Sequence, residues 1–296
     1  MTRTTAVIIA GASVAALVIA GADGAALGAA APPQTFHAST DAVSLDVAVF
    51  DGDRVVPRLS AGDFEVFDNG VRQTISTADR NSLPIDLRLV FDTSDSITPA
   101  ALEKYRRAMN RVAESLKPAD TAEILTFGTH IGLAAPRQHP PVRIELARAG
   151  SSGTSFFDAV SLAMITKRTL ERRQITIVLS DAVDNASFFD EAALYDAARR
   201  TDAVVYAVLP AEIPADAAPL TTRLRMLTLL TGGRLVQASR DGPMGQAIID
   251  ALEEFRQSYV LRYVISGVPI PGWHALTVRV RGAKYTIRAR EGYFGR

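Results

Sequence analysis

The chain has 296 residues, with 32 Lys and Arg against 32 Asp and Glu, and it contains no cysteine. A net charge of zero gives no support for nucleic acid as a bulk electrostatic partner. The absence of cysteine excludes disulfides, thiolate metal sites and cysteine nucleophiles. The length is sufficient for one large domain or two modest ones.

Residues 1–31 have the features of a targeting segment. Arg3 and the amino terminus supply positive charge, the apolar run "AVIIAGASVAALVIAGA" follows, and small residues come after it. We therefore predict a signal peptide over 1–31 and an exported protein, either periplasmic or secreted. The alternative is an uncleaved membrane anchor, because the apolar run is almost long enough to span a bilayer.

Residues 38–82 are predicted to form β structure. The stretch "AVSLDVAVFD" (42–51) alternates apolar and polar residues, as a half-buried strand requires. "FEVFDNGVRQTIS" (64–76) consists of two short runs around Asn69 and Gly70. That pair accepts the positive φ angles of a type I′ turn, so a hairpin is expected here.

Residues 84–257 alternate between strand and helix patterns. Apolar runs predict strands over 87–91, 121–128, 175–180, 203–210 and 234–239. Helical spacing predicts helices from Thr98–Pro99 to Pro118, over 154–170, 187–200 and 220–230, and around Ile248, Leu252 and Phe255. This alternation indicates an α/β fold with a doubly wound, mostly parallel sheet that is covered by helices on both faces.

The last segment, 258–296, returns to alternating strands joined by turns that contain Gly and Pro. Each flanking β segment has only about forty residues, which is too few to bury a stable core alone. We predict that 38–82 and 258–296 pair into one smaller β-domain, with the 84–257 domain inserted between them. The alternative is two separate satellites packed on the α/β domain.

Polar side chains stand in three loops of the predicted α/β region. "DTSDS" (92–96) follows the first strand of the α/β region, Thr154 stands at a helix start, and Asp181 follows the strand 175–180. In an open α/β sheet, ligands bind beyond the carboxyl ends of the strands. The candidate metal ligands are Asp92, Ser94, Ser96, Thr154 and Asp181. Two carboxylates and three hydroxyls suit a hard cation, Mg²⁺ first and Mn²⁺ or Ca²⁺ as alternatives.

The motifs "FDTSDS", "SGTSFFDAV", "VLSDAVDN" and "TGGRL" together resemble the von Willebrand factor type A (VWFA) domain. That family carries a metal-ion-dependent adhesion site with the pattern D-x-S-x-S, then a distant threonine and a distant aspartate. The resemblance implies that the five residues named above form such a site. The flanks "LSAGDFEVFDNGVRQTI" and "IRAREGYFG" resemble an exported bacterial family described as VWFA-related.

Two positions depart from the VWFA pattern. Asp95 stands where a glycine is common, so it either adds negative charge near the metal or faces solvent. Ala182 stands where a glycine usually follows the aspartate, which strains the loop only if that position needs a positive φ. Neither departure removes a ligand.

The resemblance implies a non-enzymatic protein-binding module, in which an Asp or Glu of the partner protein completes the Mg²⁺ coordination. One alternative is an envelope scaffold in which the metal is only structural. The other is a Mg²⁺-dependent phosphatase-like enzyme, but its acid/base aspartate is expected two residues after Asp92, where Ser94 stands. The mature chain also lacks the G-x-S-x-G and G-x-x-x-x-G-K-[ST] signatures.

Structural interpretations compete at several other positions. Thr154 by itself is a plausible helix N-cap. The histidines, His37, His130, His139 and His274, show no metal-ligand spacing and are predicted to lie at the surface. The cluster Lys167, Arg168, Arg172 and Arg173 is interpreted as a solvated face near a helix end. Trp273 and Tyr293 are expected to be packing residues.

Overall fold

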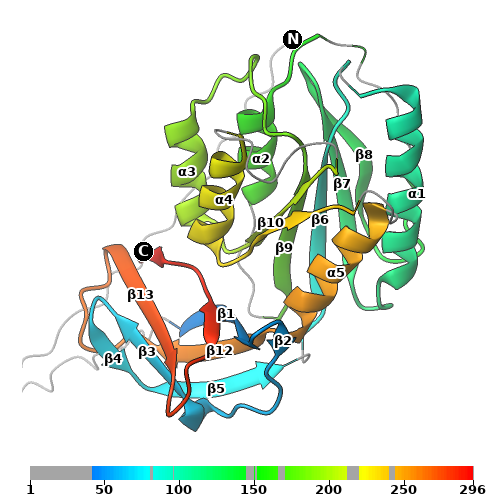
Figure 1. Cartoon of the computed structure of the whole chain (residues 1–296). Helices are drawn as coiled ribbons and strands as arrows, with labels where there is room; N and C mark the ends of the chain where they lie inside the picture. Colours follow the sequence, from blue (N-terminus) through cyan, green and yellow to red (C-terminus); the bar gives the residue numbers. More distant parts are fainter. Residues whose placement is uncertain are drawn as a thin grey trace, which may run out of the picture. The chain divides into compact units, whose positions relative to one another are not determined.

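The computed structural model (Figure 1) describes residues 42–80, 83–95, 97–144, 150, 152–165, 171–211, 220–239 and 244–295. The predicted targeting segment 1–31 lies outside them, as does His37. Among the helices of the described ranges, none has the length and apolar character that crossing a membrane requires.

A six-stranded sheet forms the centre of the α/β region, in the order β11-β10-β9-β6-β7-β8. Its strands are β6 Ile85–Asp92, β7 Thr121–Phe127, β8 Ile131–Gln138, β9 Arg173–Leu179, β10 Val204–Leu209 and β11 Leu235–Gln237. All neighbours run parallel except the edge strand β8, which is antiparallel to β7. The predicted doubly wound, mostly parallel α/β fold is confirmed, and β8 is a strand that the sequence pattern did not predict.

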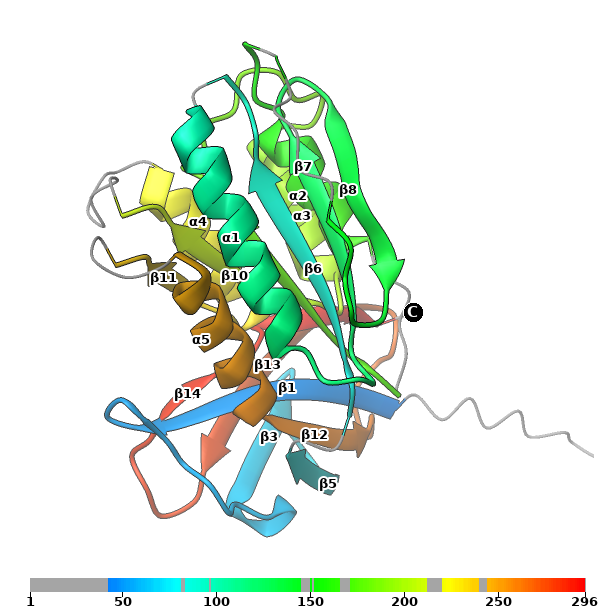
Figure 2. The same ribbon diagram turned by 90° about the vertical axis from the view of Figure 1, so that its right-hand side faces the viewer.

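Helices cover both faces of this sheet (Figures 1 and 2). The helices are α1 Pro99–Ser115 and α5 Met244–Gln257 on one face, and α2 Phe156–Met164, α3 Glu191–Arg200 and α4 Leu220–Thr231 on the other. Within β6, Leu89 and Phe91 pack in the core under α1 and α5, whereas Val90 packs in the core under α2, α3 and α4. Burial on both faces explains why the strands are continuous apolar runs.

The helix starts follow from local capping. Thr98 accepts a hydrogen bond from the Ala101 amide at 3.2 Å and Pro99 occupies the first turn, as predicted for α1. Helix α3 begins later than predicted, because the Asp190 carboxylate caps the Ala193 amide at 2.8 Å and thereby places 187–189 in the preceding loop. The predicted extension of α2 over 166–170 lies outside the described residues.

The two flanking segments pair with each other in two antiparallel sheets, β14-β1-β12-β5 and β15-β13-β3-β4. The strands are β1 Ala42–Asp51, β2 Arg54–Val55 beside β1, β3 Phe64–Asp68, β4 Val71–Gln73, β5 Ile75–Arg80, β12 Tyr259–Val264, β13 Gly272–Val280, β14 Thr286–Arg288 and β15 Gly292–Gly295. Asn69 and Gly70 both have positive φ, 46° and 81°, so the predicted turn between β3 and β4 is confirmed. The inward residues of the strands share one apolar core.

The prediction of a solvated Arg173 is wrong. Arg173 begins β9 with only 4% of its surface exposed, and its guanidinium lies 2.6 Å from the Asp46 carboxylate of β1. It also donates to the Phe255 carbonyl at 2.8 Å and lies 4.1 Å from the centre of the Phe255 ring. A buried arginine is stable here because acceptors from β1 and α5 surround it.

His274 is likewise not a surface residue, because β13 turns it inward and it is fully buried. Its Nδ1 lies 2.7 Å from the Asp68 carboxylate and its Nε2 lies 2.8 Å from the Ile270 carbonyl. The Tyr293 hydroxyl donates to the same carboxylate at 2.6 Å, and Tyr293 is buried as predicted. His130 and His139 are exposed, as predicted.

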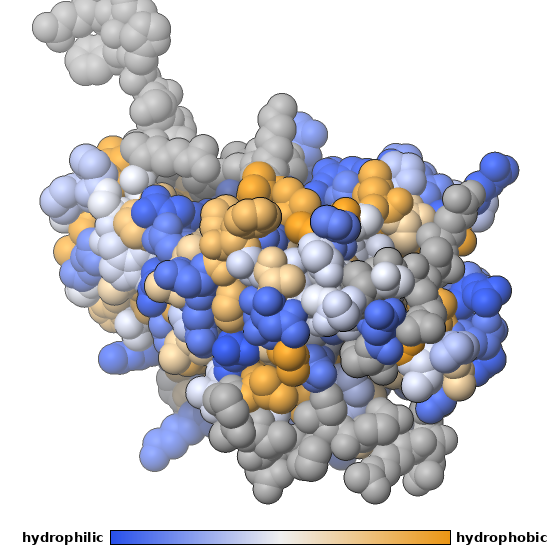
Figure 3. Space-filling view, turned by 90° about the horizontal axis from the view of Figure 1, so that it is seen from above, coloured by the Kyte–Doolittle hydropathy of each residue, from blue (hydrophilic) through white to orange (hydrophobic). Residues whose placement is uncertain are grey.

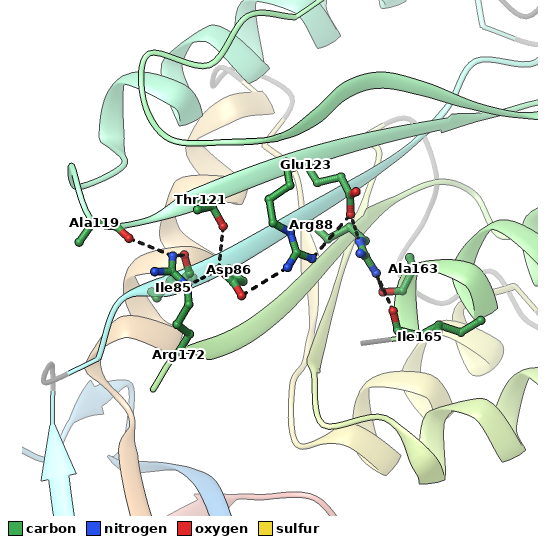
Figure 4. Close-up of polar contacts among 10 residues, drawn as sticks. Ile85, Asp86, Arg88, Ala119, Thr121, Glu123, Ala163, Ile165 and Arg172 are labelled. Carbon is green, nitrogen blue, oxygen red and sulfur yellow. Dashed lines mark hydrogen bonds and ion pairs between the residues drawn. The ribbon is translucent and has the colours of Figure 1, made fainter. Parts of the chain in front are cut away.

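Ion pairs line the amino-terminal end of β6 and β7 (Figure 4). Asp86 accepts hydrogen bonds from Thr121 at 2.7 Å and from Arg172 at 2.5 Å, and Arg137 lies 3.6 Å away. Arg88 pairs with the Glu123 carboxylate at 2.5 Å. The acidic groups at this end are therefore balanced by arginines.

Candidate metal centre

The opposite, carboxyl-terminal edge of the sheet contains a topological switch point. From β6 the chain builds outward through β7 and β8 on one side, and from β9 it builds outward through β10 and β11 on the other. Neighbouring loops diverge at such a point and leave a crevice for ligands. Asp92 is the last residue of β6, and Asp181 follows the end of β9 at Leu179. Both candidate carboxylates thus stand at the switch point.

Asp92 is buried, with 3% of its surface exposed. One of its carboxylate oxygens accepts the Ser94 amide at 2.9 Å, and the other accepts the Ser180 hydroxyl at 3.5 Å. Ser180 also accepts the Ala182 amide at 3.0 Å. Sequence reasoning missed Ser180, although a hydroxyl directly before Asp181 at a strand end was a usable signal. This residue connects the two loops that carry the carboxylates.

The surroundings of Asp92 disfavour the ionised form of its carboxylate. Burial raises the pKa of Asp92 above its ordinary value of 3.8, hydrogen bonds from Ser94 oppose this, and the negative charge of Asp181 raises the pKa further. Within the described ranges neither carboxylate forms an ion pair with an arginine, lysine or histidine. Two acidic groups therefore stand at this edge, and no basic side chain among the described residues pairs with either of them.

Thr154 is buried and lies in the segment that leads into α2, where Ser155 and not Thr154 is the N-cap residue. The Thr154 amide donates to the Asn185 side-chain oxygen at 2.8 Å, and the Thr154 carbonyl accepts the Asn185 amide at 3.0 Å. Thr154 is thus fixed to the loop that begins with Asp181. The N-cap interpretation of Thr154 is wrong.

Gly153 explains how closely these loops approach one another. A Cβ atom at this position would lie 2.7 Å from the Thr129 hydroxyl and 3.0 Å from the Ala186 side chain. Those distances are too short for any residue larger than glycine without movement of its neighbours. The glycine therefore allows the Thr154 segment to pack between the loops that follow β7 and β9.

Four of the five predicted ligands are described, and they lie on loops that contact one another. Ser94 is bound to Asp92, Ser180 directly before Asp181 donates to Asp92, and Thr154 is bound to the Asp181 loop. Ser96 lies outside the described residues. The complete five-residue ligand set stays a prediction.

The structure shows the conformation of Ala182 and the exposure of Asp95, the two residues that depart from the VWFA pattern. Ala182 has φ 62°, so it adopts the left-handed conformation that strains a residue with a Cβ. Arg223 of α4 holds this conformation by donating to the Ala182 carbonyl at 2.5 Å. Asp95 is exposed, which places it at the solvent side of the loop.

The donor set fits a hard divalent cation. The described residues contain no group of three or more His, Cys, Asp or Glu arranged to hold a metal. A metal at this edge would have to be held by Asp92 and Asp181 together with hydroxyl oxygens, and oxygen ligands are those that Mg²⁺, Mn²⁺ and Ca²⁺ accept. A dication would also offset the repulsion between the two carboxylates.

No family model and no curated protein sequence matches the chain. Several solved structures to which it is similar are von Willebrand factor type A domains, including one from Catenulispora acidiphila, with 10% identity over 83% of this chain and 75% of that chain and a TM-score of 0.47. Manganese-loaded TRAP protein from Plasmodium vivax has 14% identity over 77% of this chain and 99% of that chain, with a TM-score of 0.41.

The chain is also similar to proximal thread matrix protein 1 of the mussel byssus, in a structure with a zinc-occupied MIDAS motif. The identity is 13% and the TM-score is 0.48, over 62% of this chain and 48% of that chain. The chain thus spans about half the length of the mussel protein. The strand order and the placement of Asp92 and Asp181 are properties of this chain's own structure and do not depend on these similarities.

Proposed function

We propose that this protein is an exported, non-enzymatic binding module of the VWFA type that captures a partner protein through a divalent cation. Asp92, Ser94, Ser96, Thr154 and Asp181 would hold the cation, with Mg²⁺ as the expected ion. One observation carries the proposal: the buried Asp92 and Asp181 both stand at the switch point of the sheet, and among the described residues neither forms an ion pair with a basic side chain.

The proposed ligand set explains why the partner would be acidic. The two carboxylates cancel the charge of a dication, and neutral hydroxyls fill further positions without adding repulsion. Mg²⁺ takes six oxygen ligands, so five protein side chains leave a position for an oxygen from outside. When bound, the cation supplies an electrophilic position that a partner's Asp or Glu completes by a charge-assisted contact.

The local geometry supports binding over catalysis. A phosphatase of the alternative kind needs an acid/base carboxylate near the Asp92 nucleophile. At the expected position stands Ser94, whose amide is already used by the Asp92 carboxylate. Asp95 is the next acidic residue and is exposed to solvent. A Mg²⁺-dependent phosphatase activity in the purified protein would contradict the proposal.

The test compares the full mature protein with its Asp92→Asn variant in Mg²⁺ and in EDTA. We expect Mg²⁺ to raise the melting temperature of the wild type but not of the variant. Partner capture from an envelope extract is expected only for the wild type in Mg²⁺. Capture that persists in EDTA, with a stabilising effect of Mg²⁺, would instead support the structural-metal scaffold.

A further inference from the structure

The loop between Asp181 and α3 exposes two adjacent phenylalanines. Phe188 has 98% of its surface exposed and Phe189 has 53%. The sequence pattern placed both in a helix, but α3 begins only at Glu191. A single exposed apolar residue is common on protein surfaces. Phe188 differs because the backbone that carries its ring is held in place.

Two aspartates fix this loop to the first turn of α2. The Asp158 carboxylate accepts the amides of Phe188 and Phe189, each at 2.9 Å. In return, the Asp184 carboxylate accepts the Phe157 amide at 2.9 Å. The backbone of the phenylalanine pair is thus restrained on both of its amides. An apolar group held in this way loses less conformational entropy when a partner covers it.

The exposed pair continues into an apolar groove. A groove of about 400 Å³ runs between α2 and α3. Phe189, Met164, Ile165, Ala193 and Ala197 give it an apolar part, and Asp196, Arg200 and Asp202 line its other end. Ile165, at the C-terminal end of α2 next to Arg88, has 69% of its surface exposed, so the groove leads away from the candidate metal centre. Figure 3 looks onto the carboxyl-terminal edge of the sheet and shows hydrophobic groups gathered in patches among hydrophilic ones on this face. The phenylalanine pair, but not the rest of the groove, therefore shares the loop that follows β9 with the candidate ligand Asp181.

The charges on this loop indicate which partner fits. If the cation is bound, Asp92 and Asp181 are neutralised and the open position favours a carboxylate. The same loop then presents Phe188 seven residues after Asp181, and Thr154 is hydrogen-bonded to the loop between them. A partner segment that places its acidic group on the cation brings its neighbouring side chains over the phenylalanine pair. An apolar neighbour would bury that surface, whereas a polar neighbour would not.

We infer that Phe188 and Phe189 form the apolar half of the partner-binding surface, and that the partner is a protein segment with an acidic residue and a large apolar residue at a fixed, short spacing. This inference rests on the proposed function. Aromatic side chains at the centre of interfaces often dominate the binding energy, so Phe188→Ser is expected to weaken binding at least about tenfold.

The test is a selection of random dodecapeptides displayed on phage against the immobilised full chain in Mg²⁺. We expect EDTA to elute the bound phage, and their sequences to share an acidic and a large apolar residue at one spacing. Against Phe188→Ser, the acidic preference should stay and the apolar preference should disappear. Leu229→Ser is the control, because Leu229 on α4 is a large apolar residue with 53% of its surface exposed and lies outside the loop that follows β9. This variant should select the same motif as the wild type.

The outcomes separate the two hypotheses. If the selected peptides share an acidic residue but no apolar one, or if Phe188→Ser selects the unchanged motif, this inference is overturned and the proposed function stands. If the peptides lack an acidic residue or survive EDTA, the proposed function fails and the inference falls with it. Failure to enrich any motif also overturns the inference, and the Mg²⁺ effect on melting temperature then decides the proposed function. Phe188→Ser should leave that effect unchanged.

Discussion

The two ends of strand β6 carry buried aspartates in opposite electrostatic situations. Asp86 at the amino-terminal end is held by Arg172 at 2.5 Å and faces Arg137 at 3.6 Å (Figure 4). At the carboxyl-terminal end, the Asp92 carboxylate accepts hydrogen bonds from the Ser94 amide and the Ser180 hydroxyl, neither of which is charged. The negative charge of Asp181 also raises its pKa. The protein's own arginines thus neutralise the Asp86 carboxylate but not the Asp92 carboxylate.

This difference distinguishes a structural acid from a ligand-binding acid. Burying a carboxylate costs several kcal/mol unless a positive charge or hydrogen bonds compensate for the lost hydration. At Asp86 the compensation is built into neighbouring strands and holds the sheet together. At Asp92 the missing charge has to come from outside, which is what we expect of a cation site. The following predictions test that contrast, from the largest expected effect to the smallest.

Replacing Asp86 should destabilise the fold without affecting the cation. We expect Asp86→Ala to lower the free energy of unfolding by about 3 kcal/mol, because the partly buried Arg172 and Thr121 lose the carboxylate they donate to, and Arg172 keeps only carbonyl acceptors, at Ile85 and Ala119, among the described hydrogen bonds. Urea denaturation measures the change, and the loss should be the same in Mg²⁺ and in EDTA. A variant that no longer responds to Mg²⁺ would show that the two ends are not independent.

Mg²⁺ should stabilise the wild type by binding at the carboxyl-terminal end of β6, at Asp92. At about a hundredfold excess over the dissociation constant, the ion should add roughly 2.7 kcal/mol. For a chain of this size that corresponds to a rise in melting temperature of roughly 5 °C. Asp92→Asn should abolish the rise because it removes one of the two anionic ligands. Thermal denaturation measures both, and an unchanged rise in the variant would exclude Asp92 as a ligand.

The raised pKa of Asp92 makes stability depend on pH when no cation is present. Because the folded protein binds the Asp92 proton more tightly than the unfolded chain does, its stability should fall as the pH rises above 3.8 and through the raised pKa. At pH 7 in EDTA, Asp92→Asn should therefore be more stable than the wild type. Denaturation of both proteins from pH 4 to pH 8 measures this, and a variant of lower stability at pH 7 would contradict it.

The smallest change in stability should come from replacing Ala182, whose backbone is strained. We expect Ala182→Gly to raise the free energy of unfolding by about 0.5 kcal/mol, since relief of the left-handed strain exceeds the added freedom of the unfolded chain. Ala186→Gly in the same loop is the control, because Ala186 has no positive φ, and it should be neutral or destabilising. Equal effects of the two substitutions would remove strain as the explanation.

Much of the fold was predictable because local pattern and tertiary burial agree. The strands β6, β9 and β10 each contain an apolar run, at 89–91, 177–179 and 204–209, and all lie inside the sheet. The Asn69–Gly70 pair fixes a turn through its backbone conformation alone. The alternation of strands and helices was enough to place the ends of β6 and β9 at one edge. Asp92 and Asp181 followed from that placement.

The sequence-based predictions were wrong where residues distant in the chain determine whether a strand forms or a side chain is buried. Strand β8 contains Gly132 and Pro136 and lacks clear alternation, and it forms by irregular pairing with β7. Arg173 and His274 are buried because acceptors lie 127 and 206 positions away in the chain, at Asp46 and Asp68. No sequence pattern contains such separations. Phe188 was misplaced because the Asp190 cap determines where α3 starts.

The pairing of β5 with β12 has a consequence for how this chain can be rebuilt. Arg80 lies opposite Tyr259 in that antiparallel pair, and the Arg80 guanidinium donates to the Gln257 carbonyl at 2.7 Å. The chain leaves the β sheets at the end of β5 and re-enters them at the start of β12, which is hydrogen-bonded to β5. The whole α/β region between Arg80 and Tyr259 therefore stands where a hairpin turn would connect these two strands. Proteins accept insertions whose two ends lie close together. A short turn grafted between Arg80 and Tyr259 should therefore leave a self-contained β scaffold, and the excised stretch could be transplanted into another hairpin.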